Sequence, residues 1–184
     1  MCTPVNATNN PAGHHRRSIR LPGYDYRQAG AYFVTICVEN RACLFGEIVN
    51  DTMQLNDAGS MLARQWQVLP QRFANVRLDV FVVMPNHIHG IIVLTDGRME
   101  PPSEATTRVS PASLGDVVGA YKSLTTVEYV RGVKASRWTP FDGKLWQRNY
   151  YEHIIRNESV LHDIRNYIIH NPSKWAEDTE NPER

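Results

Sequence analysis

Two apolar, β-branched runs joined by a Pro-Asn pair constrain the fold of this chain more than any other feature. They are residues 80–83 (VFVV) and 91–94 (IIVL), with Pro85 and Asn86 between them. Such runs favour β-strands, and a Pro-Asn turn joins two strands into a tight antiparallel hairpin. Because neither run alternates with polar residues, we expect both strands to lie inside a sheet that is partly covered on both faces.

The other elements follow from apolar periodicity and from turn and capping residues. We expect a strand over 32–38, a short strand over 44–49, a helix over 55–73 capped by Asn56 or Asp57 and ended or kinked at Pro70, a helix over 114–131 between Ser113 and Gly132, a strand over 145–155, and a helix from Asn157 that Pro172 ends. This order predicts an α+β, ferredoxin-like fold. In it, two helices cover one face of an antiparallel sheet, and a C-terminal catalytic helix approaches the other.

Composition indicates one domain in a reducing compartment. Within 184 residues, we expect a flexible basic arm over 1–22, a domain over 23–175 with a flexible loop over 97–112, and a disordered tail over 176–184. The three cysteines lack CxxC spacing. No apolar run approaches the roughly 18 residues of a membrane span, and the N-terminus does not resemble a signal peptide. These features predict a cytoplasmic protein with no membrane contact.

The hairpin carries two histidines, His87 and His89, directly after its turn. Alternate residues of a strand point to the same face, so both imidazoles can reach one divalent ion. The alternative is that the two histidines are incidental. Burying two polar rings among apolar neighbours without partners would cost a few kcal/mol, and we therefore favour a metal site.

The expected terminal helix offers a further ligand beside a nucleophile. Tyr167 and Asn171 are four residues apart and so share one helix face. Asn171 can supply a carbonyl oxygen to the ion, with His170 as an alternative ligand. Tyr150 and Tyr151, on the last expected strand, compete with Tyr167 for the role of nucleophile.

Five segments carry a resemblance to a known family. They are residues 83–90 (VMPNHIHG), 146–156 (WQRNYYEHIIR), 166–172 (NYIIHNP), 16–21 (RRSIRL) and 24–26 (YDY). Along the chain these segments follow the family's order, and over roughly residues 16 to 175 the chain resembles the REP-associated tyrosine transposases. These are a domesticated branch of the HUH single-tyrosine transposases of small bacterial insertion sequences.

The resemblance implies an activity and a site. His87 and His89 would be metal ligands and Tyr167 the nucleophile, while Asn171 stands where mobile-element transposases usually have a glutamine ligand. The asparagine is one methylene shorter, so His170 or water can take that place. The ion would be Mg²⁺ or Mn²⁺, since two imidazoles suit Mn²⁺ at least as well. The substrate would be a single-stranded DNA hairpin from dispersed bacterial palindromic repeats, cleaved with a 5′-phosphotyrosine and a free 3′-OH.

Several side chains are expected to assist. A tyrosine hydroxyl has a reference pKa of about 10, so either metal proximity or a basic neighbour such as Arg165 or Lys174 must help to activate it. Phosphate and base contacts are expected from Arg16, Arg17, Arg20, Lys122 and Trp146, with Trp138 and Tyr150 as further stacking aromatics. Both monomer and homodimer fit the sequence.

Two other functions share parts of this pattern. A non-catalytic single-stranded nucleic-acid-binding protein on the same fold would need no metal pair, so His87 and His89 count against it. A metal hydrolase that uses water would need further ligands, and few histidines or clustered carboxylates follow residue 90.

Overall fold

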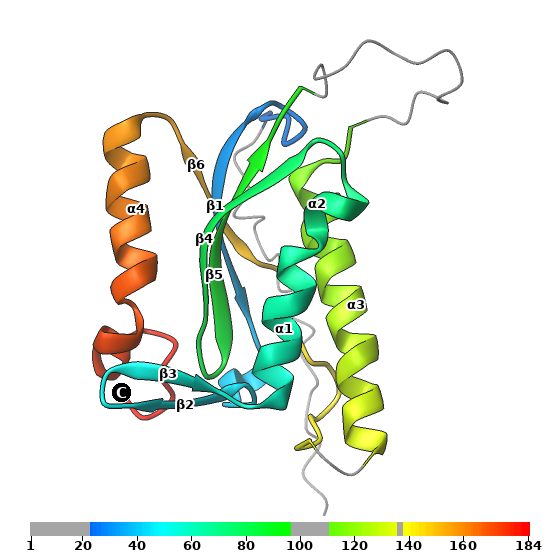
Figure 1. Cartoon of the computed structure of the whole chain (residues 1–184), viewed down its shortest axis with the longest axis vertical. Helices are drawn as coiled ribbons and strands as arrows, with labels where there is room; N and C mark the ends of the chain where they lie inside the picture. Colours follow the sequence, from blue (N-terminus) through cyan, green and yellow to red (C-terminus); the bar gives the residue numbers. More distant parts are fainter. Residues whose placement is uncertain (1–22, 97–110, 136–137) are drawn as a thin grey trace, which may run out of the picture.

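A four-stranded antiparallel sheet with the order β4-β5-β1-β6 organises the structure (Figure 1). The computed structural model describes residues 23–96, 111–135 and 138–184. The strands are β1 (Gly30–Cys37), β4 (Val76–Val83), β5 (His87–Leu94) and β6 (Tyr151–Ile155). Two consecutive helices lie between β1 and β4, and a long helix lies between β5 and β6, so this is the predicted ferredoxin-like arrangement.

Helices lie on both faces of the sheet, as Figure 1 shows. One face carries α1 (Asp57–Gln67), α2 (Leu69–Arg72) and α3 (Leu114–Lys134), whereas α4 (Glu158–His170) lies on the other. The side chains of Asn56, Ser113 and Asn157 cap the N-termini of α1, α3 and α4, each accepting a hydrogen bond from a backbone N–H. Pro70 lies in the first turn of α2, directly after α1 has ended, as predicted.

Smaller elements gather at the end of the sheet where β5 begins. They are a hairpin of β2 (Gly46–Val49) and β3 (Thr52–Leu55), and two 3₁₀ helices, η1 (Glu39–Arg41) and η2 (Pro172–Glu177). The sequence indicated the first hairpin strand but not the second. Figure 1 shows the C-terminal segment folded beside the β2–β3 hairpin, and η2 packs against β3.

Four expectations differ from the structure. β4 is an edge strand, although β5 beside it is central and almost wholly buried. The last strand begins at Tyr151 rather than residue 145. α3 continues past Gly132 to Lys134. Gly132 serves packing instead of ending the helix, since a Cβ there would lie 2.2 Å from the Trp138 ring. Residues 176–184, expected to be disordered, instead form the end of η2 and a hydrogen-bonded turn.

The sheet separates two apolar clusters. The larger one, between the sheet and helices α1 and α3, includes Trp66, Tyr121 and Ile92. The smaller one, under α4, is formed by Phe33, Ile91, Ile155 and Ile168. This smaller cluster docks α4 across the face onto which His87 and His89 project.

The basic arm over 1–22 lies outside the described residues, as does the loop expected over 97–112 except for its last two residues. Among the helices that the structure describes, none has the length and apolar character needed to cross a membrane.

Candidate active site

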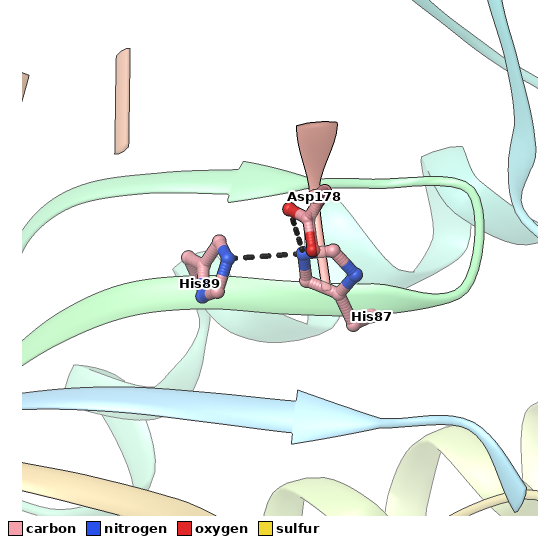
Figure 2. Close-up of side chains that lie close together, drawn as sticks. All are labelled: His87, His89 and Asp178. Carbon is pink, nitrogen blue, oxygen red and sulfur yellow. Dashed lines mark hydrogen bonds and ion pairs between the residues drawn. The ribbon is translucent and has the colours of Figure 1, made fainter. Parts of the chain in front are cut away.

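His87 and His89 bring their imidazole rings together at the start of β5. Their Nε2 atoms lie 3.0 Å apart, and the side chains are 0% and 4% exposed. Figure 2 shows both rings on the same side of the strand. Burial lowers the pKa of His87 to about 3 and that of His89 well below its ordinary value. Both imidazoles are therefore neutral at pH 7, which is the form that binds a metal ion.

A network of hydrogen bonds orients the His87 ring. The side-chain nitrogen of Asn86 donates to the carbonyls of Arg41 and Glu180, at 3.0 Å and 2.7 Å. The Asn86 oxygen consequently faces His87 Nδ1, 2.9 Å away, and accepts its proton. With the proton on Nδ1, the lone pair of His87 Nε2 points toward His89.

The His89 ring is fixed from the neighbouring strand. Thr35 on β1 lies opposite His89 in the ladder, and its hydroxyl is 2.8 Å from His89 Nδ1. The Thr35 hydroxyl can accept a proton from Nδ1, which leaves the Nε2 lone pair free for a ligand. Each imidazole thus has a hydrogen-bond partner on the nitrogen that faces away from the other ring.

Asp178 joins the two histidines, although nothing in the sequence pattern singled it out. One of its carboxylate oxygens, Oδ2, lies 3.8 Å from His87 Nε2 (Figure 2). Ligand atoms of His87, His89 and Asp178 all lie within 4.8 Å of one another. The same Asp178 oxygen is buried and has no hydrogen-bond partner among the described residues.

Asn171 supplies a second buried oxygen from the end of α4. Its side chain is 3% exposed, and within the described chain its amide oxygen has no hydrogen-bond partner. The alternative ligand His170 is exposed, and its Nδ1 lies 2.8 Å from the carbonyl of Asn166 on its own helix. The structure therefore brings Asn171, but not His170, into a buried position.

These donors fit a divalent cation. Two imidazole lone pairs that face each other at 3.0 Å repel unless a proton or a cation lies between them. Two ligands about 2.1 Å from an octahedral ion, at right angles, would themselves be about 3.0 Å apart. The unpartnered oxygens of Asn171 and Asp178 are hard donors, which together with two imidazoles suit Mn²⁺ as well as Mg²⁺.

Tyr167 places its hydroxyl beside this cluster. The hydroxyl oxygen is 3.2 Å from His89 Nε2, while the side chain as a whole is 45% exposed. Burial of the hydroxyl and the nearby Asp178 carboxylate raise its pKa, and the Asn171 side chain partly offsets this. Without a cation, the phenol is therefore protonated at neutral pH.

The two basic residues suggested as activators of Tyr167 are not in contact with it. The Arg165 guanidinium pairs with Asp79 on β4, with Nε 3.0 Å from the carboxylate oxygen Oδ1. Lys174 has no side-chain hydrogen bond or ion pair within the described ranges.

The rival tyrosines lie elsewhere. Tyr150 packs against the larger core on the opposite face of the sheet, with the Lys122 ammonium 5.5 Å from its ring centroid. Tyr151 is on the same face as Tyr167, but its ring contacts Phe33 rather than either histidine.

Two of the residues expected to contact DNA, Lys122 and Trp146, make interactions within the protein instead. Lys122 donates hydrogen bonds to the carbonyls of Gln147 and Asn149, both at 2.9 Å, and burial lowers its pKa to about 8. Trp146 is a core residue, 5% exposed, whose ring nitrogen donates to Thr125. The prediction that Trp146 stacks on bases is therefore wrong. Arg16, Arg17 and Arg20 lie outside the described residues.

A polar pocket of about 540 Å³ offers other cationic side chains near the cluster. It adjoins the site through Arg41, whose carbonyl holds Asn86. The pocket is lined by Glu39, Asn40, Arg41, Lys144, Gln147, Arg148 and Asn149.

Comparison with known proteins places the chain in a family. No known protein-family model matches this sequence. An uncharacterized protein of Haemophilus influenzae is 41% identical over 180 residues, which cover 92% of this chain and 94% of the relative. The chain belongs to the same family as that protein.

A solved structure shows the same fold. It is that of a REP-associated tyrosine transposase bound to a REP hairpin, which superimposes with a TM-score of 0.54 and 19% sequence identity. The match covers 84% of this chain and 73% of the transposase. At this identity the match shows a shared fold, so the activity must be argued from the residues of this chain.

Proposed function

We propose that this protein is a metal-dependent, single-strand DNA endonuclease and transesterase in which Tyr167 is the nucleophile. One observation carries the proposal: the Tyr167 hydroxyl lies 3.2 Å from His89 Nε2, at the edge of a buried cluster of metal-ligand types. A phenol, two neutral imidazoles and a carboxylate are together suited to phosphoryl transfer.

The residues of the cluster would hold one divalent cation, Mg²⁺ or Mn²⁺. His87 and His89 would bind it through Nε2, and Asp178 and Asn171 through their unpartnered oxygens. When bound, such a cation supplies positive charge that neutralises a non-bridging phosphate oxygen and lowers the pKa of a nearby phenol. It would thereby offset the effect of burial and of Asp178 on Tyr167.

Tyr167 would attack the scissile phosphorus. Its oxygen forms a bond to phosphorus while the bond to the 3′-oxygen of the preceding nucleotide breaks, and the phenolic proton ends on that leaving oxygen or on water. The products are a 5′-phosphotyrosine and a free 3′-OH. Because one phosphodiester replaces another, the step is nearly balanced in energy and can run backwards to join strands. No nucleoside triphosphate is needed, which agrees with the absence of a phosphate-binding GxxxxGK[ST] motif.

We infer that the substrate is a palindromic DNA hairpin with unpaired flanks. The transposase that shares the fold was solved with a REP hairpin. The exposed face of Tyr167 and the cationic pocket around Arg148 leave room for an unpaired strand beside the cluster.

The test is formation of a covalent protein–DNA adduct. The purified protein is incubated with labelled DNA hairpins that carry unpaired flanks, in Mn²⁺, Mg²⁺ or EDTA, and run on a denaturing gel. We expect an adduct in the presence of a divalent ion and none in EDTA, with full duplex of the same sequence as the negative control. Hairpin binding without an adduct in either metal would instead favour the non-catalytic nucleic-acid-binding function.

A further inference from the structure

The half of the sheet face beside α4 carries exposed aromatic side chains next to Tyr167. In the antiparallel ladder, Tyr151 on β6 lies opposite Thr35, and His153 lies opposite Phe33. Residues directly opposite each other share a face, and Thr35 faces the site through its contact with His89. Tyr151 and His153 therefore point to the face that holds the proposed active site.

The side chains on this half of the face are open to solvent. Tyr151 is 51% exposed, and His153 is also exposed. α4 packs chiefly against β4, and its buried Ile168 inserts beside Ile91. α4 therefore leaves the β6 edge of this face uncovered at Tyr151 and His153.

Phe33 links this open strip to the proposed nucleophile. Its ring centroid lies 6.2 Å from that of Tyr151, 5.9 Å from that of Tyr167 and 5.4 Å from that of His89. The two tyrosine rings each meet Phe33 edge to face, at interplanar angles of 69° and 85°. Phe33 itself is only 8% exposed, so its buried ring supports the solvent-exposed Tyr151 ring from below.

We propose that Tyr151 and His153 form a stacking strip for unpaired bases of the DNA strand beside the scissile phosphate, with the Tyr151 ring against the base nearest Tyr167. This proposal rests on the proposed function and adds to it the side chains that hold the single strand. Every base offers a flat π face, so such a strip binds single strands without sequence preference and excludes a duplex, whose bases are already stacked.

The dimensions and charges of β6 suit such a strand. Tyr151 and His153 are two residues apart on a strand, or about 7 Å. Neighbouring bases in a helical strand are about 3.4 Å apart. The distance between the two rings is about twice that, so the rings would contact different bases. Arg148 and Arg156, just before and just after β6, are exposed, and neither forms an ion pair within the described ranges. They can meet the phosphates on either side.

The experiment separates stacking from catalysis. It uses the full chain carrying Tyr167→Phe, in EDTA, with an oligodeoxythymidine of about 20 nucleotides that contains 5-iododeoxyuridine at one position. Ultraviolet irradiation joins this base to an aromatic ring stacked on it, and mass spectrometry identifies the joined peptide. We expect the cross-link on Tyr151 or His153.

Affinity for the same oligonucleotide gives a second readout by fluorescence anisotropy. We expect Tyr151→Ala to weaken binding roughly tenfold or more and Tyr151→Phe, which keeps the ring, to change it less than twofold. Val127→Ala, a similarly exposed site on α3, is the control and should bind normally. Thermal unfolding of each variant establishes that it is folded.

The proposal is overturned if the cross-links lie only outside β6, or if folded Tyr151→Ala binds like its parent. Neither readout requires a metal ion or the nucleophile. A cross-link on Tyr151 combined with no covalent adduct from the wild-type protein would leave the stacking strip standing and refute the catalytic proposal. A covalent adduct from the wild-type protein combined with no cross-link on β6 would support the catalytic proposal and refute the stacking strip.

Discussion

The hydroxyl oxygen of Tyr167 lies 3.2 Å from Nε2 of His89, a residue 78 positions earlier in the chain. The next residue, Ile168, explains how this pairing is held, because its fully buried side chain joins Ile91 and Phe33 in the cluster under α4. Consecutive helix residues point about 100° apart. Anchoring Ile168 in the core therefore places Tyr167 at the boundary between the cluster and solvent.

Removing a proposed ligand should weaken metal binding. Loss of a residue that only hydrogen bonds to a metal ligand typically lowers metal affinity roughly 10- to 100-fold, so we expect His87→Ala to lower Mn²⁺ affinity by at least that factor. Asp178→Asn should lower the affinity as well, since the amide lacks the negative charge of the carboxylate. Titration calorimetry with Mn²⁺ measures both. His162→Ala, an exposed histidine on α4, is the control. Unchanged affinity in Asp178→Asn would remove Asp178 from the ligand set.

The Thr35 hydroxyl should strengthen metal binding through its hydrogen bond with His89. Thr35→Val has a similar shape but cannot hydrogen bond to Nδ1, so the ring loses the partner that fixes its tautomer. We expect a roughly 10- to 100-fold loss of Mn²⁺ affinity and recovery in Thr35→Ser, which keeps the hydroxyl. If the valine variant binds Mn²⁺ as tightly as wild type, the hydroxyl does not orient the ligand.

Gly90, directly after His89, should tolerate no side chain. It faces the opposite side of β5, where a Cβ would lie 2.4 Å from the Trp66 ring. We expect Gly90→Ala to lower the free energy of unfolding by about 1–3 kcal/mol through overpacking. Gly119→Ala on α3 meets nothing within 4 Å and should raise it by about 0.5–1 kcal/mol. Urea unfolding of the two variants checks this contrast, and equal effects would contradict it.

The ion pair between Asp79 and Arg165 should make the docking of α4 depend on pH. The Arg165 hydrogen bond lowers the pKa of Asp79 below its ordinary 3.8. A lowered folded-state pKa means that the stabilisation is present at neutral pH and is lost as the pH falls through that pKa. Since the pair is partly exposed, we expect Asp79→Asn to cost less than about 1 kcal/mol at pH 7.

The pH dependence is measured by urea unfolding of wild type and Asp79→Asn. The two should converge in stability at acidic pH. Asp163→Asn, at an exposed carboxylate on α4, serves as the control. A difference that stays constant from pH 7 into the acidic range would show that the charge of Asp79 is not its source.

Much of the fold could be predicted because its signals are local. The hairpin around Pro85 and Asn86, and the helix caps at Ser113 and Asn157, depend on neighbouring residues in the sequence. The sharing of a face by His87 and His89 follows from strand geometry alone. The edge position of β4 could not be predicted in this way. Its apolar side chains pack in a cluster completed by α4, so its sequence has the apolar character expected of a central strand.

The tail and Trp146 show what local pattern cannot supply. Asp178 lies in a polar stretch whose composition predicts disorder. Long-range contacts hold the tail over the site: the hydrogen bond from Asn86 to the Glu180 carbonyl and the ion pair between Arg41 and Glu180. Trp146 belongs to a motif that suggests base stacking, yet its ring packs on Phe45 and Tyr121 inside the core. In both cases the deciding contacts are distant in sequence.

The most direct test of the central claim is to locate the covalent bond between protein and DNA. Wild type, Tyr167→Phe and Tyr151→Phe are incubated with labelled hairpin DNA and Mn²⁺, and any denaturation-resistant adduct is digested and mapped by mass spectrometry. We predict a phosphotyrosine at position 167 in wild type and in Tyr151→Phe, and no adduct in Tyr167→Phe. An adduct that persists in Tyr167→Phe, or that maps to another tyrosine, would contradict the account.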